Sequence, residues 1–159
     1  MLYERGIKWT EEVSDPVNDF NLSISIDRTN LCPNIVAAPT TDAEKSQSWP
    51  FDVRTVTPDN LDIAGIASFL QVNGKGQKSI KKLLTELLDI YFKKEAFVLE
   101  TNVALAEDGQ MQIKHARFGF DDAALKSGGR QKDVHSLRNK SQEVPEEVEA
   151  ENDGIIYVK

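Results

Sequence analysis

Two polar side chains, Glu100 and Asn102, are spaced so that they could hold a cation. They lie two positions apart in a β-rich run over residues 97–106, and residues at i and i+2 of a strand project from the same face. Carboxylate and amide oxygens are the hard donors that Mg²⁺ and Ca²⁺ take as ligands. The pair therefore predicts a candidate cation site, although two strand residues alone do not specify one.

A turn signal follows this run and predicts its partner. Asp108 and Gly109 separate it from a second β-rich run, and Asp-Gly is a strong signal for a hairpin because Gly takes positive φ at no steric cost. We predict a β-hairpin within residues 97–125.

Alternation of apolar and polar residues predicts a second pair of strands upstream. Phe20 begins a run in which every second residue is apolar, which is typical of a half-buried strand. Residues 27–30 read as a turn, and residues 34–38 as an antiparallel partner strand. The polar stretch over residues 39–56 has no clear period and is interpreted as a surface excursion.

Two helices are expected to cover the strands. Thr57 followed by Pro58 is favourable for a helix start, and this helix is predicted to end near Leu70, before a break at residues 73–76. Residues 79–93 have the most regular helical spacing of apolar side chains in the chain. We expect this second helix to contribute most to the core.

Composition excludes several classes of protein. The chain has 159 residues, 40% of them hydrophobic, and a formal net charge of -7, so we expect one globular domain rather than a disordered chain. The acidic balance argues against direct binding of nucleic acid or of an anionic membrane. The single cysteine, Cys32, excludes an internal disulfide framework. No apolar run is long enough to span a membrane, and no targeting segment is recognisable at the start of the chain.

Several segments together resemble the β subunit of succinyl-CoA synthetase, an ATP-grasp carboxylate–CoA ligase. They follow one another in the order of that family and span nearly the whole chain. The matching segments are Tyr3-Glu4, Asp27-Arg28, Glu100-Thr101-Asn102, His115-Ala116-Arg117, and residues 120–125 and 137–146.

The resemblance implies site residues. It assigns nucleotide contacts to Glu4 and Glu100, and Mg²⁺ ligands to Asn102 and to the position of His115, with ATP or GTP as the nucleotide. The family has an aspartate where this chain has His115, and a proline where it has Val103. Imidazole is a softer donor than the carboxylate it replaces. We therefore expect weak metal binding and impaired phosphoryl transfer, which depends on metal positioning and charge neutralisation.

The resemblance also implies a fold and a domain organisation. It predicts an α+β fold, an antiparallel sheet with helices on one side, similar to the C-terminal lobe of an ATP-grasp domain. Residues 1–125 would form this lobe in part, and residues 126–159 a linker, an acidic helix and a terminal strand. In the family a CoA-ligase domain follows that strand, so we expect no CoA site within this chain.

Two functions remain open. The first is a diverged and incomplete succinyl-CoA synthetase β-type protein, inactive as this chain alone and paired with an α-type subunit. The second is a non-catalytic structural subunit of a larger mitochondrial complex, such as the mitochondrial ribosome, that retains the ligase fold. The resemblance implies a location in the mitochondrial matrix. It does not decide whether the chain is an enzyme or which nucleotide it prefers.

Overall fold

The computed structural model describes residues 2–4, 16–40, 44–72, 74–121, 128–137, 139, 141 and 143–154. Its elements are β1 (Leu2–Glu4), β2 (Pro16–Asp27), β3 (Cys32–Pro39), β4 (Gln47–Pro50), α1 (Ile63–Phe69), α2 (Gly74–Lys93), β5 (Ala96–Ala106), β6 (Met111–Phe120), α4 (Lys132–Ser136) and α5 (Pro145–Asn152).

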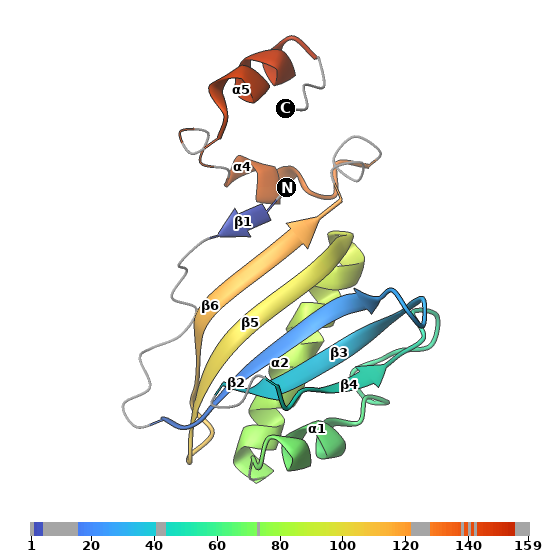
Figure 1. Ribbon diagram of the computed structural model, residues 1–159, viewed down its shortest axis with the longest axis vertical. Helices are drawn as coiled ribbons and strands as arrows, with labels where there is room; N and C mark the ends of the chain where they lie inside the picture. The colour runs from blue at the N-terminus through green and yellow to red at the C-terminus, as the bar shows by residue number, and fades with distance from the viewer. Residues whose placement is uncertain are drawn as a thin grey trace.

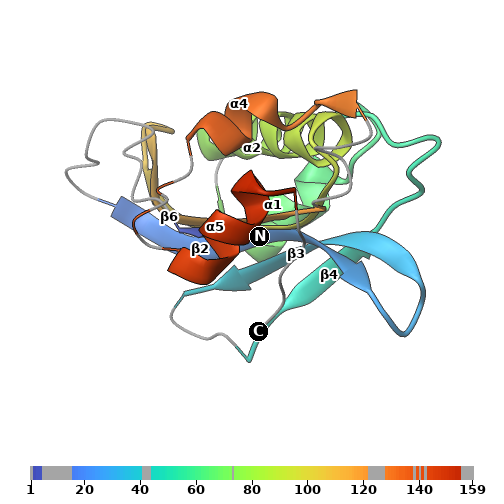
Figure 2. The same cartoon turned by 90° about the horizontal axis from the view of Figure 1, so that it is seen from above.

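The strands form one antiparallel sheet with the order β1-β6-β5-β2-β3-β4. Helices α1 and α2 lie together against one face of it (Figures 1 and 2). The core lies between this face and the helices, where Phe20, Leu22 and Ile24 of β2 are buried with Leu99 of β5. The predicted α+β class, with helices on one side of an antiparallel sheet, is confirmed.

The predicted hairpin is formed by β5 and β6. Gly109 in its turn has φ of 90°, a conformation that glycine adopts without strain. The Oγ of Ser79 on α2 donates a hydrogen bond to the Gly109 carbonyl oxygen at 2.7 Å. The hairpin tip is therefore attached to the helix that packs beneath the sheet.

Helix α2 carries the apolar stripe that its spacing predicted. Its buried side chains are Ile80, Leu83, Leu84, Leu87 and Leu88. The helix begins at Gly74, however, five residues before the predicted start, so residues 74–76 are not the expected break. Gly76 is buried, and a Cβ there would lie 2.6 Å from Cδ2 of Leu105, so the absence of a side chain allows the first turn to approach β5.

The predicted start of the first helix was wrong. Helix α1 begins at Ile63, where Asp62 caps it by accepting a hydrogen bond from the Gly65 amide at 2.9 Å. Thr57 instead begins a turn, in which its amide donates to Oδ1 of Asn60 at 2.8 Å. The side chain of Asn60 thus satisfies a backbone group locally and holds the residues before α1 out of the helix.

The stretch over residues 39–56 is also more regular than predicted. It contains β4, which pairs with β3 so that Trp49 lies opposite Ile35. The Trp49 ring packs edge-on against Phe69 of α1, with 5.8 Å between ring centroids. Partial burial of one aromatic residue against the helix supports a strand whose other residues, Gln47, Ser48 and Pro50, are exposed, which is why alternation did not reveal it.

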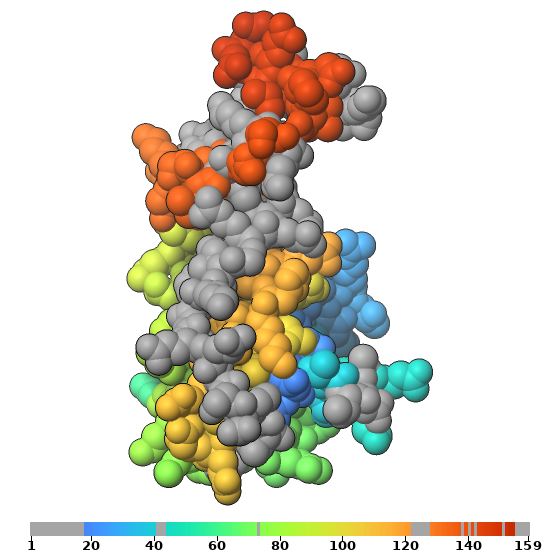
Figure 3. Space-filling view, turned by 90° about the vertical axis from the view of Figure 1, so that its left-hand side faces the viewer, coloured from blue at the N-terminus to red at the C-terminus, as the bar shows by residue number. Residues whose placement is uncertain are grey.

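Beyond the sheet, the chain continues through α4 and α5. Gln131 precedes α4, is 1% exposed, and its Nε2 donates to the carbonyl oxygens of Lys94 at 2.8 Å and Asp121 at 2.9 Å. The acidic helix α5 projects away from the sheet (Figures 1 and 3). The helical signs over residues 133–142 correspond in part to α4, and the predicted terminal strand at residues 155–158 lies outside the described residues.

Substituting Leu87 by Asp should lower the free energy of unfolding by more than about 4 kcal/mol, because it buries an unpaired carboxylate in the core. Leu87 is 2% exposed and belongs to the central cluster. Chemical denaturation measures the effect. The neighbouring Glu86→Gln variant is the control, since Glu86 is exposed and should leave stability unchanged. A Leu87→Asp protein as stable as the parent would contradict the assigned core.

The pKa of Asp133 should return toward its ordinary value when Lys94 is replaced by Met. Hydrogen bonding from the Lys94 ammonium, at 2.8 Å to both carboxylate oxygens, is the main cause that lowers the pKa of Asp133. A lowered pKa means that this pair stabilises the folded chain above the unfolded pKa and loses its effect as pH falls through the folded pKa. Carboxyl ¹³C NMR titration measures both proteins, and equal midpoints would contradict the assigned pair.

Candidate functional site

The face of the sheet opposite α1 and α2 carries polar side chains, and we call it the open face. It includes the described site candidates and their neighbours. Its members are Asp19, Asn21, Ser23, Glu100, Asn102, Lys114, His115 and Arg117. Because residues directly opposite on antiparallel strands point to the same side, the strand register decides which of these side chains meet.

The first row of the open face is centred on Glu100. Register places it opposite Arg117 on β6 and Ser23 on β2, and Nη1 of Arg117 lies 3.3 Å from Oε2 of Glu100. Both side chains are close to half exposed. Glu4 continues the row, because its backbone pairs with Arg117 through β1, whereas its side chain lies outside the described part of the structure.

The second row is centred on Asn102. It lies opposite His115 on β6 and Asn21 on β2, and its Nδ2 donates to Oδ1 of Asn21 at 3.0 Å. His115 is exposed. The structure therefore brings the two predicted metal ligands to the same row, and places Glu100 one row away on the same face.

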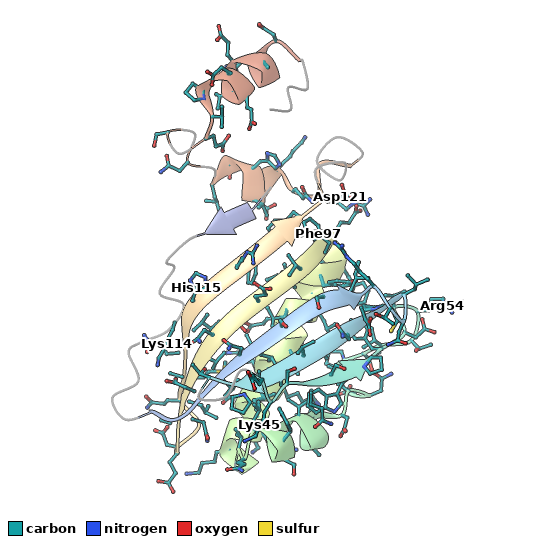
Figure 4. The ribbon with its side chains drawn as sticks, in the orientation of Figure 1. Lys45, Arg54, Phe97, Lys114, His115 and Asp121 are labelled. Atoms are coloured by element: carbon teal, nitrogen blue, oxygen red, sulfur yellow. The ribbon has the colours of Figure 1, made fainter. Side chains whose placement is uncertain are left out.

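A β-bulge at Lys114 adds a third charged group. Asn102 pairs with His115 and Val103 pairs with Ile113, so Lys114 is an extra residue between them. Its Nζ lies 2.7 Å from Oδ2 of Asp19 on β2. Lys114 and His115 are adjacent in sequence, yet both contribute to the open face, as Figure 4 shows them together beside β6.

Sequence reasoning did not assign five members of this face to the site, namely Asp19, Asn21, Ser23, Lys114 and Arg117. The alternation of β2 and the hairpin register contained a signal for Asn21 and Arg117, since each lies directly across from a predicted site residue. The bulge had no such signal, because it depends on a single unpaired residue in a strand of otherwise regular pattern.

A hollow in the described surface lies elsewhere. It is lined by Leu31, Cys32, Pro33, Pro50, Phe51, Asp52, Val53 and Arg54, at the end of the sheet where the β2–β3 turn approaches the loop after β4. Figure 4 shows Arg54 near the β4 edge of the sheet, whereas His115 lies near β6 at the other edge. None of the predicted site residues contributes to this hollow.

The donor set that the structure describes on the open face does not fit Mg²⁺. Glu100 is paired with the Arg117 guanidinium, Asn102 supplies a neutral amide, and His115 supplies a nitrogen donor. Magnesium takes near-octahedral oxygen ligands and is bound through carboxylates. Among the described residues, no group of three or more His, Cys, Asp or Glu side chains could hold a metal ion.

Comparison with known sequences identifies relatives of one kind, although no family model matches the chain. The chain is 30% identical over 164 residues to the β subunit of ADP-forming succinate–CoA ligase from Syntrophotalea carbinolica, covering 97% of the chain and 42% of the relative. The corresponding subunit from Campylobacter fetus is 28% identical over 149 residues, covering 89% and 38%. The chain thus spans about two fifths of the length of these relatives.

Comparison with solved structures identifies the fold. An ATP citrate lyase from Methanothrix soehngenii, solved with citrate and coenzyme A, superposes with a TM-score of 0.66 at 18% identity, covering 89% of this chain and 34% of that one. An ATP citrate lyase from Methanosaeta concilii, in complex with (3S)-citryl-CoA, superposes with a TM-score of 0.61 at 17% identity, covering 87% and 33%. Among the described residues, no helix is both long and apolar enough to cross a membrane.

Removing the Glu100–Arg117 pair should change stability little. Both side chains are more than 40% exposed, and exposed ion pairs contribute about 0.2–1 kcal/mol. A double-mutant cycle with Glu100→Gln and Arg117→Met, followed by chemical denaturation, should give a coupling free energy of at most about 1 kcal/mol. A much larger coupling would show that the pair maintains the fold rather than setting the charge of the open face.

Proposed function

We propose, from the premise that this chain is a partial and diverged relative of the succinate–CoA ligase β subunit, that its open face is the nucleotide-facing side of an ATP-grasp lobe. The chain has the α+β fold of the second lobe of an ATP-grasp domain, with both α1 and α2 on the other face of the sheet. The ligand side is thereby assigned to the polar face.

The observation that carries this proposal is the row formed by Asn102 and His115. The family resemblance assigned both positions to a metal–nucleotide site, and the β5–β6 register places them directly opposite each other. Glu100, the predicted nucleotide contact, follows on the same face of β5. The residues that the resemblance assigns to one site are thus neighbours in space, as a shared ligand requires.

The chemistry of this lobe is proposed to be impaired. Phosphoryl transfer depends on metal ions that position the phosphates and neutralise their charge, and the donor set of the open face does not fit Mg²⁺. We therefore propose that the chain by itself does not catalyse succinyl-CoA formation. Binding of a nucleoside triphosphate and pairing with an α-type subunit are the parts of the relatives' function that the lobe would retain.

A non-catalytic structural role is the second candidate. It is favoured by the internal pairing of the open face, where Glu100 bonds Arg117 and Asp19 bonds Lys114. A polar face that satisfies its own charges can persist without a ligand. Membership of a mitochondrial assembly, and a location in the mitochondrial matrix, stay predictions from the resemblance.

A hybrid protein tests the leading proposal. This chain replaces the matching span of the Syntrophotalea carbinolica β subunit, which is coexpressed with the α-type subunit of the same organism. We expect the purified hybrid to bind ATP saturably, measured by isothermal titration calorimetry, and to show no succinate-, CoA- and ATP-dependent turnover. The unmodified relative is the positive control for both measurements.

Two results would contradict the proposal. Turnover by this chain on its own would show that the open face is catalytically competent as it stands. A hybrid that assembles with its partner but binds no ATP would show that the open face is not a nucleotide-facing surface, and would favour the structural role instead.

A further inference from the structure

We infer that the open face of this chain excludes divalent cations, because the side chains of Arg117 and Lys114 on β6 already neutralise the carboxylates that would bind a metal ion. The inference rests on the proposed function only in that it concerns the same face. It assigns a specific cause to the poor fit for Mg²⁺: Arg117 and Lys114, rather than the change at His115 alone.

Arg117 pairs with Glu100, the carboxylate nearest in sequence to Asn102, and so makes it less available as a metal ligand. Its guanidinium lies 3.3 Å from Glu100 and remains protonated throughout the physiological pH range. A divalent cation bound to Glu100 would have to displace this guanidinium or lie beside it. Both arrangements are unfavourable, because like charges at close range repel and an arginine side chain cannot neutralise itself by losing a proton.

Lys114 has the same effect on the other side of the Asn102 row. The bulge in β6 places its ammonium 2.7 Å from Oδ2 and 2.9 Å from Oδ1 of Asp19. Asp19 lies opposite Ala104, two residues from Asn102 along β5. The two described carboxylates that flank the row of Asn21, Asn102 and His115, those of Glu100 and Asp19, are thus each paired with a cation from β6.

The row itself contributes no negative charge. Asn21 and Asn102 are neutral amides joined by a hydrogen bond, and an imidazole such as that of His115 supplies no carboxylate oxygen. Among the side chains that the structure describes there, the two carboxylates of Glu100 and Asp19 and the two cations of Arg117 and Lys114 therefore sum to zero before any ion binds. A divalent ion would leave two positive charges without compensation, whereas the hard divalent cations are bound where carboxylates are in excess.

Manganese titration of the ¹⁵N-labelled chain tests the inference, because bound Mn²⁺ broadens the amide signals of nearby residues. For the parent chain we expect no saturable broadening at residues 100–102 and 114–117. The double variant Arg117→Gln with His115→Asp releases Glu100 and adds a second carboxylate. It should gain saturable broadening there, with affinity at least roughly tenfold above the parent, the scale on which groups around a metal affect binding.

Two further variants make the test specific. Lys93→Gln breaks a similar exposed pair with Asp89 on α2, so it removes one cation away from the open face and should gain no binding. His115→Asp alone keeps Arg117, and should gain less than the double variant. Dispersion of the amide spectrum confirms that each protein is folded.

Saturable broadening of the parent at the open face would overturn the inference. So would a folded double variant with no gain, because release of Glu100 from the Arg117 cation would then not restore metal binding. Neither result depends on a nucleotide, whereas failure of the proposed function appears as absent ATP binding in the hybrid, so the two failures are distinguishable.

Discussion

The rest of the structure depends on strand β5, because one of its faces is buried in the core and the other carries polar side chains. One face buries Leu99, Thr101 and Val103 against the helices, and the other presents Glu100 and Asn102. Thr101 is polar but only 3% exposed, and its Oγ1 donates to the carbonyl oxygen of Leu22 at 2.7 Å. This bond satisfies a hydroxyl within the core. If a neighbouring strand slipped by one residue, its apolar side chains would move from the core to the open face. Burial of the apolar face therefore fixes the register, and with it the positions of the polar groups on the open face.

Much of this arrangement was predictable from the sequence where the period was regular. The alternation from Phe20, the turn at Gly109 and the stripe including Leu87 each matched an element of the structure. The site residues Asn102 and His115 were predicted from a family resemblance, and the hairpin register then places them opposite each other. Resemblance and periodicity are independent sources, and they agree on the same face of β5.

The parts that could not be predicted depend on single contacts rather than on a repeated pattern. Asp62 rather than Thr57 caps α1, since local hydrogen bonding by Asn60 holds the preceding residues in a turn. Strand β4 is supported by one aromatic side chain, Trp49, against α1. The bulge at Lys114 changes the charge of the open face through one unpaired residue. To predict each of these features, one would need to know which residue from elsewhere in the chain lies beside it.

The bond between Ser79 and the Gly109 carbonyl oxygen has a mechanical consequence. It joins the tip of the β5–β6 hairpin to the N-terminal part of α2, and the same helix packs along β5 through its apolar stripe. The hairpin is thus held at its tip and along its length by one helix. We therefore expect the strands that carry Glu100 and His115 to move together with α2 rather than independently of it. A movement of the open face would then displace the hairpin and α2 as one unit.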